Sequence, residues 1–302
     1  LINDLDDWRR TRPEALSQWL RAVKLIVIDE AHRAAAPQYQ KLIEEFGGEH
    51  SRTKVLGLTA TPFRNEYLTG FPELGTRELY KLFRKIARIS DIEDPRVMLQ
   101  ERGVLSRPVE QRIETGSRMR VGTDADPGIE SIESIDRRLA EDADRTSRRT
   151  LVFRHLLPVC QQPESRVIYF GPTVHDAEIV TFMLRANGIA AGFVSGGTRG
   201  AERRRAIADF KEGRLRVLCN CEVLTTGFDA PQTTHVVIAR PTVSHVLFEQ
   251  MVGRGLRGPQ FGGTAECIVM HFVDDVDSET PRLGYRAWRQ VWGLEAAVES
   301  VG

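Results

Sequence analysis

The chain has 302 residues, enough for two domains of ordinary size, and its 41% hydrophobic content can fill two cores. Its 42 basic residues balance 42 acidic ones, so no global field draws it to nucleic acid, and any such surface must be a local patch. The sequence shows no secretory signal and no run of about 20 apolar residues that could form a transmembrane helix. We therefore expect a cytoplasmic protein without membrane contact.

Residues 1–115 form a first predicted α/β block. A polar helix is followed by a buried strand at 24–28, a helix around 37–46, a second buried strand at 54–58 and a helical run at 76–88. Residues 116–130 are rich in Gly, Asp, Ser and Pro and show no apolar period, so they are predicted to be a linker. We place the domain boundary in this linker.

Residues 131–276 form a second block in which strands and helices alternate, and 277–302 are predicted to be a C-terminal tail. The predicted helices are one beginning near residue 132, 175–187 and 201–212; the predicted strands are 166–170, 189–194, 215–219, 235–239 and 267–270. Continuous apolar strands are buried on both faces, which favours a parallel sheet covered by helices. Ligands of such sheets bind beyond the carboxyl ends of the strands.

The first of these strands runs directly into Asp29-Glu30-Ala31-His32, the letters DEAH. An Asp that closes a buried strand can hold Mg²⁺, and the adjacent Glu can polarise the water that attacks a γ-phosphate. The alternative is an acidic helix N-cap after a strand. The phosphate-cradling loop G-x-x-x-x-G-K-[ST] that normally precedes such a strand appears nowhere in the sequence.

Further motifs follow in order. They are Thr59-Ala60-Thr61-Pro62, Phe170-Gly171-Pro172-Thr173, the run 224–231 with the sequence LTTGFDAP, and the run 250–257 with the sequence QMVGRGLR. The last fits Q-x-x-G-R-x-x-R at every defined position, and its two arginines are predicted to lie on one helical face, where their forks can reach a triphosphate. The alternative is a solvated basic helix end.

Together these segments resemble motifs II to VI of superfamily 2 helicases of the DExH type. The flanking sequence is closest to XPB-like helicases and to the helicase subunits of type I and type III restriction enzymes. The resemblance implies two RecA-like lobes with parallel sheets flanked by helices, the first lobe N-terminally incomplete. It covers about residues 20 to 275.

The resemblance also implies ATP and Mg²⁺ as cofactors and assigns roles to the motif residues. Asp29 serves Mg²⁺, Glu30 activates water, and His32 with Gln250 couples the site across the cleft. Thr59 and Thr61 link hydrolysis to lobe movement. Gly253 lies at the nucleotide, and Asp229 approaches the nucleotide ribose or the network between the lobes. Arg254 and Arg257 contact the γ-phosphate.

For the nucleic acid, most simply DNA, the implied backbone contacts are Thr173, Thr225, Thr226 and Gly227. Such contacts carry no base information and predict sequence-independent binding with steep salt dependence. The glycine-rich run 195–197 and the basic stretch 199–205 resemble a segment of the family near the bound strand, and a solvated helix face is an equal alternative.

Only 28 residues precede Asp29, too few for the phosphate loop and its strands, so we expect a fragment of a longer or split enzyme. Without that loop the triphosphate lacks its main cradle, and the isolated chain is predicted to have little or no ATPase activity. The first sheet is also expected to expose apolar surface.

Two rival readings remain. One is a non-catalytic nucleic-acid-binding or assembly module that has lost turnover. The other is the motor half of a split or restriction-type complex that feeds a nuclease partner. The chain shows no convincing nuclease constellation of its own, because Asp274-Asp275 near the end is predicted to be a solvated turn.

Overall fold

The computed structural model describes residues 2–31, 34, 37–47, 53–58, 83, 95–119, 132–221, 223–224, 228–276, 284–292 and 294. Contacts divide the chain into two compact units, Leu1–Asp91 and Ile92–Gly302, which are taken in turn below. Among the described helices, none combines the length and the apolar character needed to cross a bilayer.

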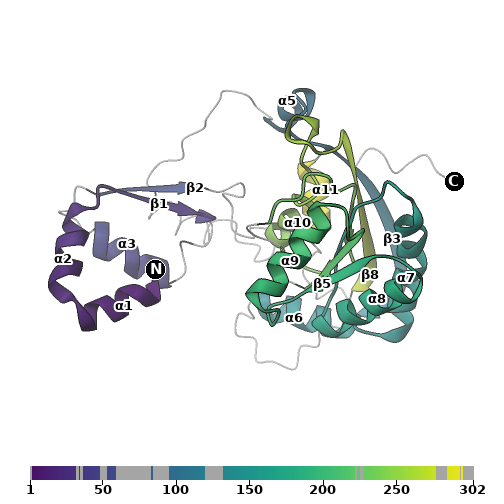
Figure 1. The fold of residues 1–302 in the computed structure, drawn as a ribbon, viewed down its shortest axis with the longest axis horizontal. Helices are drawn as coiled ribbons and strands as arrows, with labels where there is room; N and C mark the ends of the chain where they lie inside the picture. Colours follow the sequence, from purple (N-terminus) through teal and green to yellow (C-terminus); the bar gives the residue numbers. More distant parts are fainter. Residues whose placement is uncertain are drawn as a thin grey trace. The chain divides into compact units, whose positions relative to one another are not determined.

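The described residues of the first unit pair two parallel strands with three helices (Figure 1). Its elements are α1 (Ile2–Thr11), α2 (Pro13–Ala22), β1 (Leu25–Asp29), α3 (Pro37–Gly47) and β2 (Lys54–Leu58). The strands pair in register, with Asp29 opposite Leu58. Leu5, Leu16 and Phe46 form one buried cluster, and Ile28 contributes to a second.

In the part of the chain that the structure describes, the two faces of this two-stranded sheet differ in exposure. Side chains of a strand alternate between its faces, and Leu25 and Val27 of β1 lie on the face opposite Ile28. Leu25, Val27, Leu56 and Leu58 are 45–53% exposed, whereas Ile28 is 5% exposed. The apolar surface expected on the first sheet is therefore present.

The second unit contains the remaining described elements. They are α5 (Pro95–Glu101), β3 (Arg107–Met119), α6 (Ile132–Ala143), α7 (Thr146–Gln161), β4 (Val167–Phe170), α8 (Val174–Ala186), β5 (Ala191–Val194), α9 (Gly200–Lys211), β6 (Val217–Asn220), β7 (His235–Ile238), α10 (His245–Val252), the 3₁₀ turn η2 (Pro259–Phe261), β8 (Glu266–Val276) and α11 (Gly284–Val291).

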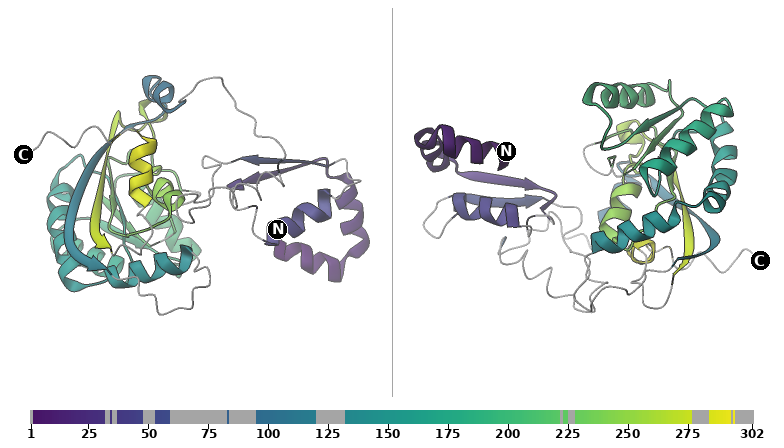
Figure 2. Two further views of the ribbon diagram at one scale, coloured as in Figure 1. Left: turned by 180° about the vertical axis from the view of Figure 1, so that it is seen from behind. Right: turned by 90° about the horizontal axis from the view of Figure 1, so that it is seen from below.

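These strands form one six-stranded sheet in the order β3-β8-β7-β4-β6-β5, and every pairing is parallel. Helices cover both faces, with α7 and α8 on one side and α10 and α11 on the other (Figures 1 and 2). The residues of β4 and β6 are all buried because they are packed from both sides. The predicted α/β fold with a parallel sheet flanked by helices is confirmed.

The division between the units lies before the predicted linker. Residues 107–119 were assigned to the first block, but they form the edge strand β3, which pairs with β8 from Arg107 opposite Glu266 to Met119 opposite Val276. The backbone hydrogen bonds with β8 place this strand in the second sheet. Its sequence contains several charged residues and no continuous apolar run, so the sequence analysis did not identify it as a strand. Residues 120–130 of the predicted linker lie outside the described residues.

Asp274 corrects a second expectation. It is not in a solvated turn but in β8, where it is 3% exposed and accepts two hydrogen bonds from Arg148 of α7. The hydroxyl of Thr115 in β3 donates to the same carboxylate at 2.5 Å. Asp274 therefore joins a helix and two strands in the core of the second unit.

The predicted tail 277–302 contains α11, which packs on α10. Trp288 is fully buried against Phe248, with ring centroids 5.4 Å apart. Glu110 of β3 accepts from Arg289 at 3.0 Å and lies 2.8 Å from Nε2 of His271. Helix α11 is thus an integral layer of the second unit.

Candidate nucleotide and nucleic-acid site

In the first unit, Asp29 is the last residue of β1 and Glu30 follows in a strained conformation. The φ angle of Glu30 is 53°, the left-handed region that non-glycine residues rarely adopt. Its amide donates to Oδ1 of Asp29 at 2.9 Å, which fixes the carboxylate at the strand end. Strain of this kind is concentrated at functional sites.

Asp29 fits the magnesium role on chemical grounds. Mg²⁺ commonly takes one or two protein carboxylates and completes its octahedron with water and phosphate oxygens. Asp29 is an exposed carboxylate at a strand end, and no group of three or more His, Cys, Asp or Glu side chains that could cage a metal occurs among the described residues. A single carboxylate of this kind suits a magnesium ion whose other ligands are water and phosphate oxygens.

In the second unit, the two motif arginines lie beyond a helix rather than on it. Helix α10 begins with Ser244 as its cap and ends at Val252, so Arg254 and Arg257 follow in a turn that we call the arginine loop (residues 253–258). The predicted helical face is therefore wrong for this pair. Gly253 is the C-terminal cap of the helix, and its amide donates to the carbonyl of Glu249 at 2.8 Å.

Packing and hydrogen bonds hold the arginine loop against the sheet. A Cβ on Gly255 would lie 2.4 Å from Sγ of Cys267, and one on Gly263 would lie 1.7 Å from the carbonyl oxygen of Arg257. Ser106, fully buried before β3, has its hydroxyl 2.7 Å from the same carbonyl. The sequence analysis missed Ser106, since no motif marks a serine that lies 151 residues from its partner.

Hydrogen bonds hold the side chains of both arginines of the loop. The Nε atom of Arg254 donates to the carbonyl of Gln250 at 3.2 Å, and its Nη1 donates to the carbonyl of Phe228. The Nε atom of Arg257 donates to Oδ1 of Asp229 at 3.0 Å, with these side chains 47% and 54% exposed. The structure thus brings Gln250, Gly253, Arg254, Arg257 and Asp229 together, and an incoming phosphate would compete with Asp229 for Arg257.

At the carboxyl edge of the sheet, Thr173 is engaged on both sides of its hydroxyl. It accepts from the Asp176 amide at 3.0 Å as the cap of α8 and donates to Oδ2 of Asp144 at 2.6 Å. Because its one proton goes to Asp144, a phosphate contact through this hydroxyl requires Asp144 to release it.

A buried charge network supports this edge. Arg149 of α7 donates to Oδ1 of Asp176 at 2.8 Å and also contacts Asp144, while the hydroxyl of Tyr169 donates to Oδ2 of Asp176 at 2.6 Å. Burial disfavours the charged form of Asp144, but hydrogen bonds from Thr173 and His175 and the charge of Arg149 outweigh it and lower its pKa. Burial raises the pKa of Asp176 despite these partners.

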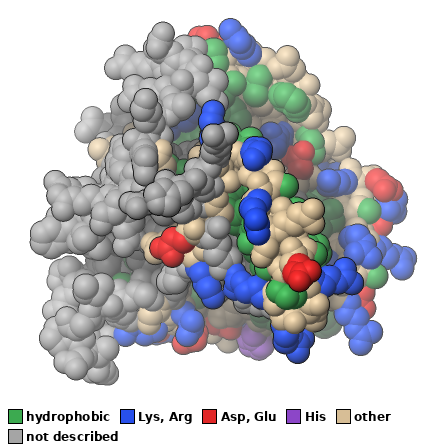
Figure 3. Space-filling model, turned by 90° about the vertical axis from the view of Figure 1, so that its left-hand side faces the viewer, with side chains coloured by type: hydrophobic (Ala, Val, Ile, Leu, Met, Phe, Trp, Pro, Cys, Tyr) green, Lys and Arg blue, Asp and Glu red, His purple; other side chains and the backbone are tan. Residues whose placement is uncertain are grey.

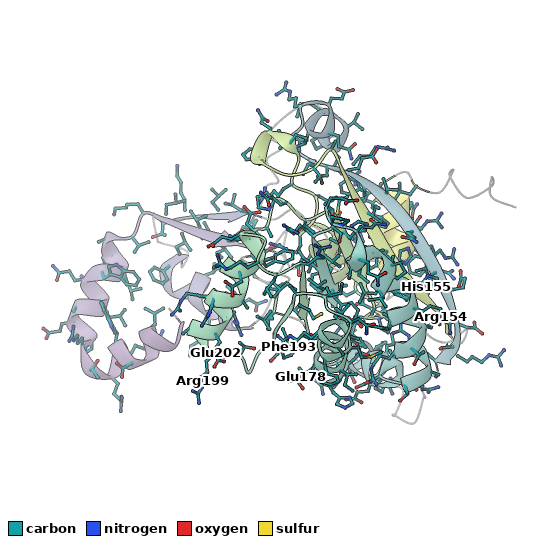
Figure 4. All side chains as sticks on the ribbon, turned by 45° about the vertical axis from the view of Figure 1, so that its right-hand side comes forward. Arg154, His155, Glu178, Phe193, Arg199 and Glu202 are labelled. Atoms are coloured by element: carbon teal, nitrogen blue, oxygen red, sulfur yellow. The ribbon has the colours of Figure 1, made fainter. Side chains whose placement is uncertain are left out.

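The basic segment after β5 is exposed. Figure 4 shows Arg199 and Glu202 where α9 begins, and both side chains are exposed to solvent. Arg203 instead donates to the carbonyl of Ser195 at 2.7 Å and closes the glycine-containing turn. On the face shown in Figure 3, Lys and Arg side chains are scattered among Asp, Glu and apolar side chains.

The other predicted site residues lie outside the described residues. They are His32, Thr59, Thr61, Thr225, Thr226 and Gly227.

Two family models match the chain. Residues 148–258 match the helicase conserved C-terminal domain, and residues 9–64 match the type III restriction enzyme res subunit. The first match contains Thr173, Asp229 and the arginine loop, and the second contains Asp29 and Glu30. The order of the two matches is the order that the motifs predict.

The chain is similar to two curated helicases from yeasts. It is 29% identical over 258 residues to the putative mitochondrial ATP-dependent helicase irc3 of Schizosaccharomyces pombe, covering 84% of this chain and 38% of that protein. It is 27% identical over 242 residues to the putative ATP-dependent helicase IRC3 of Saccharomyces cerevisiae, covering 78% of this chain and 32% of that protein. The chain therefore spans about a third of the length of these relatives.

A solved structure shares the fold. The S. cerevisiae Dbp5 structure, described as bound to RNA and ADP BeF3, aligns with a TM-score of 0.54 at 17% identity over 89% of this chain and 57% of that one. The family matches, the relatives and the RecA-like architecture confirm the resemblance to superfamily 2 helicases.

Proposed function

We propose that this chain carries the motor lobes of an ATP-dependent superfamily 2 nucleic-acid helicase or translocase. Asp29 holds Mg²⁺, Glu30 orients and activates the attacking water, and Arg254 and Arg257 stabilise the charge that develops on the γ-phosphate. ATP supplies the phosphoryl group whose hydrolysis drives the movement. We include in this proposal that residues 29–32 form a DEAH box. We also include that ATP hydrolysis is coupled to movement of the lobes by His32, Thr59, Thr61 and Gln250.

The observation that carries the proposal is the arginine loop. Its backbone is fixed by Ser106 and by glycine packing, while the guanidinium of Arg257 stays half exposed beside Asp229. A rigid loop that presents a permanently charged fork to solvent is suited to bind two oxygens of a phosphate. The fixed backbone holds the guanidinium in place, and only the ion pair between Arg257 and Asp229 has to open when the phosphate arrives.

Isothermal titration with Mg²⁺ and a non-hydrolysable ATP analogue tests this assignment. We expect Arg254→Ala and Arg257→Ala to weaken binding, whereas Arg214→Ala should not, because Arg214 is an exposed arginine that already pairs with Asp209 and Glu212 elsewhere. Equal binding by all four proteins would remove the nucleotide role of the arginine loop.

We also propose that the isolated chain hydrolyses ATP slowly or not at all, because its sequence contains no phosphate loop. A hydrolysis assay on the pure chain with a single strand present checks this. Robust turnover that Glu30→Gln abolishes would show that the chain cradles the triphosphate by other means.

The strand is proposed to be DNA, bound through the backbone at Thr173, Thr225, Thr226 and Gly227 in a cytoplasmic setting. The restriction-enzyme match at residues 9–64 supports DNA, while the aligned Dbp5 structure contains RNA and one yeast relative is named mitochondrial. Parallel titrations with matched DNA and RNA strands decide between the two nucleic acids.

The same restriction-enzyme match supports a second candidate, a motor subunit that works with a separate nuclease chain. Affinity purification of the tagged chain from its native cell, followed by a nuclease assay on the eluate, tests this candidate. Recovery of a nuclease that requires the chain would favour it over a free-standing helicase.

A further inference from the structure

A hollow lies in the second unit at the edge of the sheet opposite Thr173. Its lining includes Arg166, Phe210, Lys211, Thr233, Phe261 and Gly262, and its volume is about 220 Å³. Arg166 precedes β4, Lys211 precedes β6, Thr233 precedes β7 and Gly262 precedes β8. Because all strands are parallel, these segments meet at the amino edge, and we call the hollow the amino-edge pocket.

The walls of the amino-edge pocket are mainly apolar. Phe210 is 2% exposed and packs against Phe228 with ring centroids 6.4 Å apart, which gives the pocket a fixed floor. Phe261 is 56% exposed at the end of the η2 turn. Gly262 follows with a φ of 76°, a conformation that favours glycine and holds the turn in place.

Two cations border this apolar hollow without carboxylate partners. Among the described residues, Lys211 has no ion pair, and Arg166 donates only from Nη1 to the carbonyl of Ser165 at 3.3 Å. The Nε atom of Arg166 is enclosed and has no hydrogen-bond partner. Arg205 and Arg214, by contrast, both pair with Asp209.

An exposed aromatic ring beside unpaired cations matches the chemistry of a single nucleic-acid strand. Bases stack on aromatic faces whatever their sequence, and Lys and Arg neutralise the adjacent phosphates. An acidic peptide would satisfy the cations but would leave the flat face of Phe261 without a matching planar partner. The pocket and ring therefore favour a nucleotide over a protein segment.

We propose that the amino-edge pocket receives one base of a single strand, stacked on Phe261, with Lys211 and Arg166 bound to the flanking phosphates. This contact rests on the proposed function, since it requires that the chain bind a strand. The amino-edge pocket and Thr173 lie at opposite edges of the β-sheet. A single nucleic-acid strand of sufficient length can contact both edges.

Fluorescence anisotropy with a labelled single strand and the full chain tests the proposal. We expect Phe261→Ala to weaken binding roughly tenfold, which corresponds to about 1.4 kcal/mol, and Phe261→Trp to restore it. Lys211→Gln should lower the slope of log K against log salt by about 0.7, the value for one phosphate contact on a single strand.

Matched variants provide the controls. Phe182→Ala removes a ring that is 72% exposed on α8, and Arg214→Gln removes a charge that is already paired. Both should bind like the wild type, and thermal unfolding checks that every variant is folded. Because Phe261 is exposed, its replacement should leave the fold intact.

Each outcome has one meaning. Wild-type affinity in Phe261→Ala and Lys211→Gln overturns the pocket and leaves the proposed function standing, whereas a wild-type chain that binds no strand overturns both. If the two variants bind the strand normally but lose affinity for a labelled acidic peptide, the pocket is a protein-docking site and the proposal is wrong.

Discussion

Arg148 and Asp274 form a two-point ion pair in the core of the second unit, with Nε–Oδ1 and Nη2–Oδ2 distances of 2.9 and 2.8 Å. Their side chains are 2% and 0% exposed. We expect Asp274→Ala to lower the free energy of unfolding by about 3–5 kcal/mol, because the guanidinium of Arg148 would remain buried without its counter-ion. Urea unfolding of the two proteins measures the difference.

The neighbouring carboxylate is the matched control for that prediction. Asp275 pairs with Arg118 at 3.2 Å, but these side chains are 64% and 79% exposed. Water screens such a pair, so Asp275→Ala should change the free energy of unfolding by less than about 1 kcal/mol. Equal effects at both positions would show that the Arg148 pair is not buried in solution.

Trp288 provides a second prediction, for the docking of α11. Its ring is fully buried against Phe248 of α10. Trp288→Ala should cost about 3–5 kcal/mol through lost burial and the cavity left behind, whereas Phe182→Ala, which removes an exposed ring, should cost little. Chemical unfolding followed by circular dichroism compares them, and a small effect of Trp288→Ala would mean that α11 is not part of the folded core.

Gly263 provides a third prediction, for the position of the arginine loop. A Cβ at this residue would overlap the carbonyl oxygen of Arg257, so Gly263→Ala must displace backbone and should cost about 1–3 kcal/mol. Gly196→Ala is the control, since nothing lies within 4 Å of a Cβ there. Thermal unfolding of both variants measures the stability, and a Gly263→Ala protein as stable as the control would contradict the tight packing of the loop.

The stability of the second unit should depend on pH through His235. Burial lowers its pKa from the ordinary value of 6.5, opposed by the charge of Glu164. As the pH falls below 6.5, the unfolded chain takes up a proton at this residue before the folded one does, so the free energy of unfolding decreases in that range and is unaffected well above it.

His235→Gln removes this group while keeping a neutral polar side chain. The variant should lose part of the decrease in unfolding free energy between about pH 7.5 and pH 5.5, where the slope for one proton reaches about 1.4 kcal/mol per unit. Urea titrations at the two pH values measure the difference. Identical pH dependence in both proteins would mean that His235 titrates alike in the folded and unfolded chains.

Continuous apolar runs predicted most of the sheet from the sequence. Strands β1, β2, β4 and β7 lie within a residue of their predicted ranges. Every residue of β4 and β7 is buried, and burial on both faces leaves an unbroken apolar signal. Strands β1 and β2 are also apolar runs, although several of their side chains are exposed. Strand β3 was missed, because an edge strand alternates charged and apolar residues and its assignment depends on its partner β8. A continuous apolar run therefore identifies a strand in the middle of a sheet. It does not identify an edge strand such as β3, whose place in the sheet depends on a partner far away in the sequence.

For the candidate site, the sequence indicated which residues to consider but not how the chain holds them. Motif order indicated Asp29, Glu30, Arg254 and Arg257, but it placed both arginines on a helix, whereas α10 ends at Val252. Local spacing cannot show that Gly255 must leave the helix to pack on Cys267, nor that Ser106 holds the Arg257 carbonyl. These contacts join residues that are close only after folding.

The most direct test of the motor assignment is whether nucleotide changes strand binding. Anisotropy titrations of a labelled single strand would be run with and without Mg²⁺ and a millimolar non-hydrolysable ATP analogue, for the wild type and Arg254→Ala. Both would be tested in a longer protein that supplies a phosphate loop, because this sequence contains none. We expect the analogue to shift the wild-type affinity and to lose that effect in Arg254→Ala, since linked sites must influence each other reciprocally. Strand binding that is indifferent to the analogue in both proteins would contradict the motor and favour a non-catalytic binding module.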